Sequence, residues 1–494
     1  MILRGIVELQ NGTDVRGVAA KGVPGEDVNL DDNKTMKIVY TFAERIKKQT
    51  GKQHIKLAIG RDSRVSGEFL AQAACVGAVC SGAIVYDCGL CTTPAMFMTT
   101  VDPYLKCDGA VMITASHLPA NRNGIKFFTK RGGIEKNELS SLLHEAEEIE
   151  TSFLGGKRIP SDFLKAYAAN IVGIIRTETK NIKPLKDLHI VVDAGNGAGG
   201  FFVDDVLKPL GADTKGSQYL NPDGHFPHHI PNPENPEAMA AAVKMVKKNH
   251  ADMGIIFDTD VDRSAIIDEK GDPINRNAFI AFISKIVLQK HPGSTIVTDS
   301  VTSTGLTAFI EKLGGHHHRY KRGYRNVINE AIRLNEEGTP AYLAMETSGH
   351  GALKDNYFLD DGAYLATLAL IELYHMKQKG KPFSSFVEDL KEPEESMEVR
   401  YRITGDHFRK SGEKVLEDFK DFAAQQPGWS LVQPNYEGVR VNCDQDHGNG
   451  WCLMRLSLHE PKLPTNIESE EKGGCQMILN KIDEFLSHYQ MIEK

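Results

Sequence analysis

Ser116 stands where an apolar run gives way to polar and cationic residues. The run Ala110–Ile113 predicts a buried strand, and the chain continues as Thr-Ala-Ser116-His. A proline, an Asn-Arg-Asn-Gly turn and Lys126 follow. A hydroxyl at the end of a strand, close to cations, is a candidate carrier of negatively charged groups.

Four roles are compatible with Ser116. It is a common residue type for a helix N-cap or a turn. As a hydrolase nucleophile it lacks a G-x-S-x-G turn, and adjacency to His117 does not supply the geometry of a base. A Ser–Lys pair with Lys126 would suit acyl transfer, and a phosphoryl group on Ser116 would suit the nearby positive charge. The cations that would offset that charge are Arg16, Arg61, Arg64 and Lys126.

Three aspartates at alternate positions, Asp258, Asp260 and Asp262, follow the apolar segment Gly-Ile-Ile-Phe. Packed into one turn they would repel each other, and oxygen ligands at this spacing suit Mg²⁺. An EF-hand loop is a competing interpretation, since Glu269 falls at its twelfth position. However, Arg263 stands where that loop needs glycine, and the flanking segments predict strands. A solvated acidic turn is the simpler alternative.

Three further patterns are weaker indications of a site. Residues 195–200 fit G-x-G-x-x-G, but the next strand-like segment ends without the acidic residue of a dinucleotide site, so tight packing is favoured. Cys88 and Cys91 form a C-x-x-C without a second pair, which argues against zinc and leaves a redox role open. Residues 316–318, three consecutive histidines, lack partners at metal spacing and predict an exposed loop.

The elements that must position these side chains alternate between strands and helices. Strand-like segments end in polar loops, and helical patterns separate them, which predicts parallel or mixed sheets covered by helices. In such sheets ligands bind beyond the carboxyl ends of the strands. The side chains expected at those ends are Ser116, Asp258, Asp260, Asp262, Glu346 and Ser348.

Bulk properties describe an ordinary globular chain. Its 494 residues suggest about three or four domains. The net charge of −8 argues against a bulk nucleic-acid binder, and no apolar run is long enough to cross a bilayer. We therefore expect a protein with neither nucleic-acid nor membrane partners. It is expected in the cytoplasm, or in an organelle if a transit peptide has been removed.

Several motifs together resemble one family. TASHLPANRNGIKFF resembles the phosphoserine loop of the α-D-phosphohexomutases, which include phosphoglucomutases, phosphomannomutases and phosphoglucosamine mutases. FDTDVDR is similar to their metal loop, and METSGH to their sugar-recognition loop. NGTDVRG, GRDSRVSG and PDGHFPHHIPNPENPE also match, in order, so the resemblance covers residues 10–465.

The resemblance implies an α/β fold of three related domains with mixed sheets, plus a smaller C-terminal α+β domain, around a central cleft. The expected domains are residues 1–158 with the phosphoserine loop and 159–270 with the metal loop. Residues 271–390 would carry the sugar-recognition loop and 391–494 the phosphate-binding loop. Strand-like and helical segments after residue 391 independently favour an α+β tail.

The resemblance also implies roles for individual residues. Ser116 matches the phosphorylated serine and a metal ligand, completed by the three aspartates Asp258, Asp260 and Asp262. The residues implied around the transferred phosphoryl group are Arg16, His117 and Lys126. The residues implied in substrate binding are Arg263, Glu346, Ser348, Arg455 and Ser457.

The implied activity is that of an isomerase of carbohydrate metabolism. A phosphoserine and Mg²⁺ would move a phosphoryl group between C1 and C6 of mannose or glucose phosphate, through a hexose 1,6-bisphosphate that also acts as activator. The hexose phosphate is the expected partner, and the protein is expected to be a monomer or homodimer. Alternatives are a phosphoglucosamine mutase, a phosphoserine-dependent phosphatase, and a non-catalytic sugar-phosphate binder.

The chain departs from the family pattern in three places, the first being Leu118, where the serine loop commonly has Asn. A Gly-His pair that is common in the third domain is Gly323-Tyr324 here. The usual R-x-S-G-T-E-P phosphate loop reads RLSLHEPKLPTNIE, with Leu458 and His459 at altered positions. Phosphate binding through His459 or Lys462 is therefore an alternative to binding through Arg455.

Overall fold

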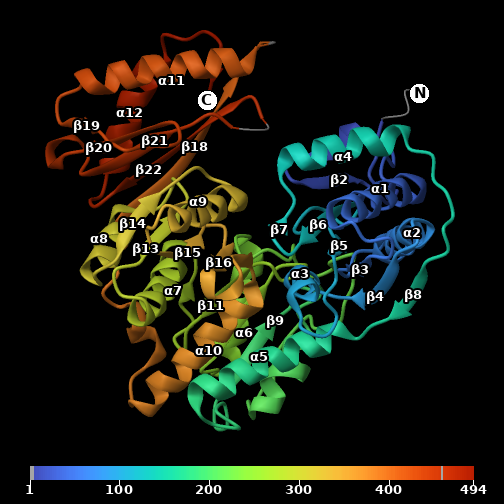
Figure 1. Cartoon of the computed structure of the whole chain (residues 1–494). Helices are drawn as coiled ribbons and strands as arrows, with labels where there is room; N and C mark the ends of the chain where they lie inside the picture. Colours follow the sequence, from blue (N-terminus) through green and yellow to red (C-terminus); the bar gives the residue numbers. More distant parts are fainter. Residues whose placement is uncertain (1–4, 406, 458–459) are drawn as a thin grey trace. The chain divides into compact units, whose positions relative to one another are not determined.

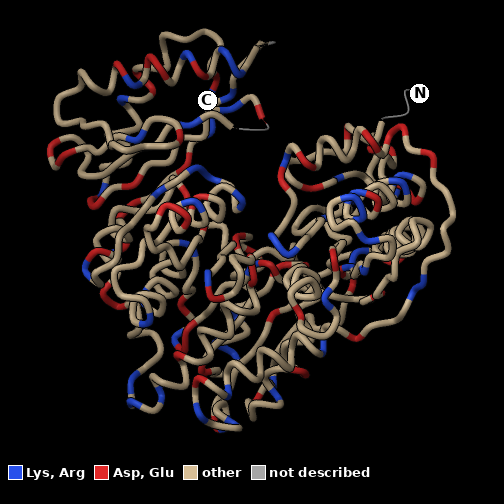
Figure 2. Tube along the Cα trace, in the orientation of Figure 1, with Lys and Arg blue, Asp and Glu red and all other residues tan. Residues whose placement is uncertain are grey.

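The computed structural model describes residues 5–405, 407–457 and 460–494, which form two compact units. The first comprises Met1–Asn275 and Ser348–Phe386, and the second comprises Arg276–Thr347 and Val387–Lys494. Figure 2 shows acidic and basic residues interspersed along the trace within each unit. None of the helices in the described ranges is long and apolar enough to cross a membrane.

The first unit begins with an eight-stranded mixed sheet (Figure 1). In pairing order the strands are β1 (Gln10–Asn11), β2 (Asp14–Val18), β6 (Arg122–Thr129), β5 (Gly109–Ile113), β3 (Lys56–Arg61), β4 (Ile84–Leu90) and β8 (Lys157–Pro160), with β7 (Gly132–Gly133) paired to β6. The strands β3, β4, β5 and β8 run parallel, whereas β1, β2 and β6 pair antiparallel.

Helices cover both faces of this sheet, because its strands are apolar on both sides. On one face, Leu57 and Ile59 of β3 share a buried cluster with Phe42. On the other face, a Cβ added to Gly60 would lie only 2.5 Å from the sulfur of Met96 in α3. The helices of this region are α1 (Asp32–Thr50), α2 (Gly67–Cys80), α3 (Thr93–Val101) and α4 (Lys136–Glu148).

A second, four-stranded sheet completes the first unit. It pairs in the order β12 (Pro273–Ile274), β11 (Ser264–Ile267), β10 (Met253–Phe257) and β9 (Ile190–Asp193), and only β9 and β10 are parallel. Apolar residues of α6 (Pro236–Asn249) pack against it. Other elements of the unit are α5 (Phe163–Thr179), a π-helical turn (Phe202–Leu207), β16 (Gly351–Leu353), β17 (Leu359–Asp360) and α10 (Gly362–Gln378).

The second unit contains three parallel strands, with β13 (Thr295–Thr298) between β14 (His316–Arg319) and β15 (Ala341–Met345). The expectation that residues 316–318 form an exposed loop is wrong, since they pair with β13. The His317 ring lies 2.8 Å from the hydroxyl oxygens of Thr298 and Thr307. The helices are α7 (Arg276–Lys290), α8 (Thr304–Lys312) and α9 (Tyr324–Glu336).

The C-terminal part of the second unit is a six-stranded antiparallel sheet with α11 (Phe408–Gln425) and α12 (Gly474–Leu486) packed on it. Lys462, assigned from sequence to the phosphate loop, instead begins a strand that pairs with two neighbours. In pairing order the strands are β19 (Trp429–Leu431), β20 (Val439–Cys443), β21 (Gly450–Met454), β22 (Lys462–Ser469), β18 (Glu395–Ile403) and β23 (Ile492–Glu493).

These elements confirm the predicted fold class of α/β segments with mixed sheets followed by an α+β segment. The boundaries between the four expected domains stay a prediction. The first expected boundary, at residue 158, falls within β8, which pairs with β4 of the first sheet through Pro160. Ser348–Phe386, expected in the third domain, belongs to the first compact unit.

Candidate active site

Ser116 lies in the loop that follows β5, at the end of the predicted buried strand. Its φ of 51° is in the left-handed region, which non-glycine residues rarely occupy. Its N–H donates to the Thr114 hydroxyl at 2.9 Å, and that hydroxyl donates to Asp62 at 2.6 Å. These bonds hold the Ser116 backbone in this strained conformation at the end of the strand.

Arg64 holds the rest of this loop. The side chain is only 1% exposed, and its guanidinium donates to the carbonyl oxygens of Pro119 at 2.8 Å and Leu118 at 2.6 Å. It also donates to the carbonyls of Ser116 and Arg122. The sequence predicts Arg64 among the cations that offset charge on Ser116, whereas these contacts make it a scaffold for the loop's main chain.

We therefore expect Arg64→Lys to loosen the loop although it preserves the charge. An ammonium cannot reproduce the fork that reaches several carbonyls, so stability should fall by about 2–3 kcal/mol. Hydrogen exchange at residues 114–122 should become faster. Arg61→Lys is the matched control, because Arg61 faces exposed Glu68 at 3.8 Å and should change stability by less than about 0.5 kcal/mol. Equal effects of the two substitutions would contradict the scaffold role.

The acidic residues occupy the hairpin loop between β10 and β11. The hairpin closes through the Phe257–Ser264 pair, so the flanking strands exclude an EF-hand. Asp258, Asp260 and Asp262 are at most 2% exposed. The start of α3 supports the loop, because the Thr93 hydroxyl donates to the Asp260 carboxylate at 2.5 Å.

The donor set fits a divalent cation. One oxygen of each of the three aspartates lies within 4.8 Å of the others. Asp260 Oδ1 and Asp262 Oδ1 are buried, and neither has a hydrogen-bond partner within the described residues. Burial, followed by the negative charge of Asp262, raises the pKa of Asp258. Clustered oxygen ligands with unfilled lone pairs suit Mg²⁺, which prefers carboxylates and retains positions for other oxygens.

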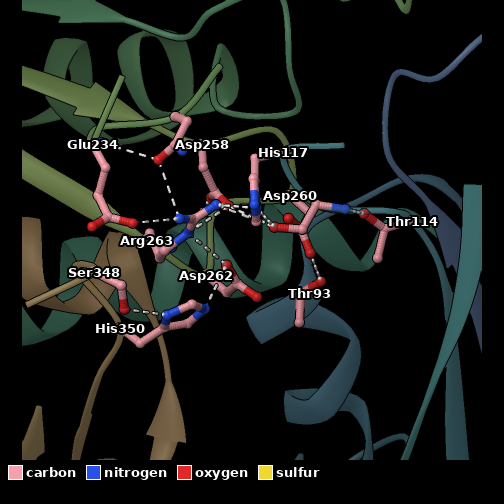
Figure 3. A network of polar contacts seen from close by, with 12 residues as sticks. Thr93, Thr114, His117, Glu234, Asp258, Asp260, Asp262, Arg263, Ser348 and His350 are labelled. Carbon is pink, nitrogen blue, oxygen red and sulfur yellow. Dashed lines mark hydrogen bonds and ion pairs between the residues drawn. The ribbon is translucent and has the colours of Figure 1, made fainter. Parts of the chain in front are cut away.

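Arg263 joins the acidic loop to the serine loop (Figure 3). The side chain is 1% exposed, and Nε donates to Asp258 Oδ2 at 3.2 Å. Its Nη2 donates to Ser116 Oγ at 3.3 Å and to His117 Nδ1 at 2.8 Å. Ser116 Oγ lies 3.3 Å from Asp258 Oδ2. The serine hydroxyl therefore has both a fixed cation and a potential metal ligand beside it.

His117 turns its Nδ1 toward these groups. Since Nδ1 accepts from Arg263, the ring proton belongs on Nε2. Desolvation, followed by the positive charge of Arg263, lowers the pKa of His117. Neutral His117 therefore lies within 3.2 Å of Ser116 Oγ.

The other two predicted phosphoryl-site cations occupy different positions. Lys126, on β6, donates to Asp262 Oδ2 at 2.6 Å and lies 3.3 Å from Asp260 Oδ2. Arg16, on β2, forms an ion pair with Asp14 at 2.7 Å and donates to the carbonyl of Thr114. Lys126 thus offsets charge in the acidic cluster, whereas Arg16 supports the serine loop.

Ser348 is linked to the same cluster through His350, a residue of the METSGH motif for which the sequence predicted no role. The Ser348 hydroxyl lies 2.8 Å from His350 Nδ1, and His350 Nε2 lies 3.8 Å from Asp262 Oδ1. Figure 3 shows the three side chains in succession. The sequence also predicted no role for Asn232, whose side-chain oxygen accepts a hydrogen bond from Arg263 Nη1 at 3.1 Å.

A second group of candidate residues lies in the second unit. Glu346 follows β15, is 4% exposed and accepts from the Gly323 N–H at 2.6 Å. The neighbouring Thr347 hydroxyl donates to Asp299 at 2.7 Å. The loop that contains the Gly323-Tyr324 departure thus directly contacts Glu346.

Arg455 is 9% exposed, and its buried Nε has no hydrogen-bond partner among the described residues. Burial, followed by the positive charge of Arg322, lowers the pKa of Arg455. Ser457 N–H donates to the Lys462 carbonyl at 3.0 Å. The Lys462 ammonium lies 3.2 Å from Glu460, and His459, with Leu458, lies outside the described residues.

Arg322 and Glu437 are candidate functional residues that sequence analysis missed. The Arg322 N–H donates to Glu437 Oε2 at 3.2 Å, and the Ser300 hydroxyl also donates to this oxygen. Arg322 Nε lies 3.8 Å from Asp299. The altered Gly-Tyr pair pointed to this loop, but nothing in the local sequence around Glu437 indicated the contact.

The weaker sequence patterns have structural explanations. A Cβ at Gly197 would lie 2.6 Å from the carbonyl oxygen of Thr259, so the glycine loop packs directly against the acidic hairpin. Cys88 and Cys91 are both buried. Burial raises the pKa of Cys91 to about 12, which disfavours a reactive thiolate.

Comparisons with known proteins identify one family along most of the chain. Three models of phosphoglucomutase/phosphomannomutase α/β/α domains match in order. Domain I matches residues 8–152, domain II residues 165–271 and domain III residues 275–393.

The chain is similar along nearly its whole length to proteins from several organisms. A Pseudomonas putida phosphomannomutase/phosphoglucomutase is 29% identical over 94% of this chain and 92% of its own. A Thermococcus kodakarensis phosphoglucomutase/phosphomannomutase is 30% identical over 92% of this chain and 94% of its own. A crystal structure of a Burkholderia thailandensis phosphoglucomutase/phosphomannomutase family protein covers 98% of this chain and 97% of its own, with 25% identity and a TM-score of 0.81.

Proposed function

The chain belongs to the phosphoglucomutase/phosphomannomutase family, and from this membership and the site geometry we propose that it interconverts hexose 1-phosphates and hexose 6-phosphates. The substrates are mannose phosphate, glucose phosphate or both. The observation that carries the proposal is Ser116 Oγ, which lies 3.3 Å from both Asp258 Oδ2 and Arg263 Nη2. A phosphoryl group on this oxygen would be adjacent to a carboxylate cluster that fits Mg²⁺.

In the proposed reaction, the phosphoryl group of phosphorylated Ser116 is transferred to the free hydroxyl of a hexose phosphate. The bond from phosphorus to Oγ breaks as the bond to the sugar oxygen forms. The resulting bisphosphate reverses its orientation and returns its other phosphoryl group to Ser116. Bound Mg²⁺ would supply positive charge for phosphoryl oxygens, with Asp258, Asp260 and Asp262 as its protein ligands.

The surrounding side chains suit the charge changes of this transfer. Arg263 can donate from Nη2 toward the serine oxygen from which the phosphoryl group departs. Asp258 and Asn232 hold its guanidinium, so it needs little rearrangement. A base must accept the proton of the sugar hydroxyl, and His117 and Lys126 are the two candidates.

A coupled assay with mannose 1-phosphate and glucose 1-phosphate tests the activity. We expect formation of the 6-phosphates, with stimulation by a hexose 1,6-bisphosphate that rephosphorylates Ser116. A parallel phosphate-release assay distinguishes the alternative phosphatase, which would hydrolyse substrate instead. Release of inorganic phosphate as the main product, with no isomerisation, would refute the mutase assignment.

We further propose that Glu346 and Ser348 recognise sugar hydroxyls, whereas Arg455, with Ser457, binds a phosphate that is not transferred. Carboxylates accept two hydrogen bonds, and guanidinium forks bind phosphate bidentately. Arg455 has a buried Nε without a protein partner in the described chain. Its unused donor favours Arg455 as the phosphate-binding residue over Lys462, which is paired with Glu460.

Mutation of the phosphate-binding residues and mutation of the sugar-binding residues should change the kinetics in different ways. Arg455→Ala should lower kcat/KM for every hexose phosphate by a similar factor of about 10–100, because each substrate presents a phosphate. Glu346→Gln should instead change the ratio between glucose and mannose substrates. Arg402→Ala, at an exposed position of the same unit, should leave the rates unchanged. Parent-like kinetics of Arg455→Ala on both sugars would reject its phosphate-binding role.

A further inference from the structure

A separate group of cations lines a cavity within the second unit. The cavity has a volume of about 300 Å³, at the lower end of the range for small-molecule sites. It lies where α8 and β14 meet β20 of the antiparallel sheet. Its polar lining residues are Thr304, Thr307, Glu311, Arg319, Arg440 and Asn442.

Arg440 is held in place, but only by neutral groups. The residue is 2% exposed, and its guanidinium donates to the carbonyls of Ser300 at 2.8 Å and Thr302 at 3.0 Å. Its Cζ lies 3.6 Å from the centroid of the Trp451 ring. Trp451 in turn packs with Val301 in a small buried cluster.

Arg319 is bound in the same manner. Its Nη2 donates to the Ser303 carbonyl at 2.7 Å and to the Thr307 hydroxyl at 2.5 Å. Its Nε donates to the Thr302 hydroxyl at 3.1 Å. All of these acceptors are uncharged, so they orient the guanidinium without neutralising it.

The two arginines therefore make no direct contact with a carboxylate, although Glu468 and Asp299 lie near enough to act on the pKa of both. Among the described residues, no carboxylate lies within ion-pair distance of either guanidinium. Desolvation lowers the pKa of both, and the positive charge of Arg319 lowers that of Arg440 further. Buried charges are normally paired, because desolvation is costly. An anionic ligand would supply the missing partner.

We propose that Arg319 and Arg440 form a binding site for the phosphate group of a small phosphorylated metabolite that also carries hydroxyl groups. Thr304 and Thr307 lie in the first turn of α8, where hydroxyls and the helix dipole favour an anion. Exposed Glu311 lies farther along α8 and can accept from hydroxyls of the ligand. The site uses none of the residues assigned above to the mutase reaction, and it does not depend on that activity.

Ligand binding here would be linked to the loop that follows β13. Arg440 donates to Ser300 and Thr302, which lie in this loop. The same loop contains Asp299, which accepts from Thr347 next to Glu346. A ligand that stabilises one arrangement of the loop would therefore change affinity at the sugar-binding residues, and the coupling would be reciprocal.

Calorimetric titration of the full chain with glucose 6-phosphate tests the proposal, in a Ser116→Ala background that prevents turnover. We expect two binding sites. Arg319→Gln should weaken one of them about 10-fold or more, through loss of a charge-assisted contact, and Arg455→Ala should weaken the other. A single site that is insensitive to Arg319→Gln would overturn the proposal. Titration with inorganic phosphate distinguishes a site for a phosphate ester from a site for the free phosphate ion, because a site for the ester should bind glucose 6-phosphate more tightly than inorganic phosphate.

A second variant keeps the test valid if Arg319→Gln folds poorly. Asn442→Asp changes an exposed lining residue without changing its size and places a carboxylate beside the cations. It should raise Tm and abolish the second site, whereas neutral Asn442→Ser should retain that site. Two unaltered sites in Asn442→Asp would reject the assignment, and loss of one site would support it.

Discussion

Substitution of Ser116 by alanine should abolish isomerisation, with a loss of activity on the order of 10⁴-fold or more. The proposed reaction begins and ends with a phosphoryl group on Ser116 Oγ, so alanine removes the atom that carries it. Stability should change little by comparison, because the removed hydroxyl has only long contacts of 3.2–3.3 Å. The measurement is the coupled mutase assay, with Tm recorded on the same samples.

Peptide mapping provides the independent readout for this prediction. Trypsin should release residues 107–122, in which Thr114 and Ser116 are the two hydroxyl residues. Fragment ions should place one phosphate on Ser116, because the Thr114 hydroxyl is engaged with Asp62 at 2.6 Å. Ser140→Ala, at a half-buried position on α4, is the control and should retain full activity and the phosphate. Full mutase activity of Ser116→Ala would falsify the phosphoserine mechanism.

Removal of the divalent cation should have an effect of similar size. With chelator in excess, turnover should stop and return on addition of Mg²⁺, because the cation that Asp258, Asp260 and Asp262 would hold supplies the positive charge needed for phosphoryl transfer. Asp260→Asn should weaken Mg²⁺ binding by at least about 10–100-fold, since changes merely to outer-shell groups have effects of that size. Calorimetric Mg²⁺ titration measures the affinity directly, without reference to activity.

The matched control for the metal prediction is Asp268→Asn. Asp268 is also buried and lies just beyond β11, where its carboxylate accepts main-chain N–H groups of Lys270 and Asp272. An amide oxygen can still accept these bonds, so Mg²⁺ affinity should match that of the parent. If Asp260→Asn binds Mg²⁺ as tightly as Asp268→Asn does, the aspartate cluster is not the metal site.

The sequence alone predicted the local elements and much of the chemistry. Apolar runs that end at Ser116 and at Asp258 predicted strand ends with candidate site residues, and the β5 and β10 boundaries agree with both. Such signals are readable because a strand and the polar loop after it are contiguous in the chain. The order of the motifs along the chain also indicates the family, without reference to the fold.

Contacts between distant segments could not be predicted in this way. Arg64 was recognisable as a cation near the serine loop, but only folding brings its guanidinium to the carbonyls of Leu118 and Pro119. Residues 316–318 have the composition of a polar loop, yet pairing with β13 makes them a strand. In both cases a polar group gains partners that its own neighbours in sequence do not supply.

The tertiary structure alone decided which charged side chains are buried without an ion pair. Arg319 and Arg440 are far apart in the sequence, and neither has a local pattern that predicts a site. Their meeting at one cavity depends on how the antiparallel sheet packs against the loop after β13. Sequence records the number of charges, whereas burial and the distance between charged groups determine their free energy. For this protein, local sequence therefore determined the strand-end chemistry, and tertiary packing determined which buried cations are held by neutral groups instead of ion pairs.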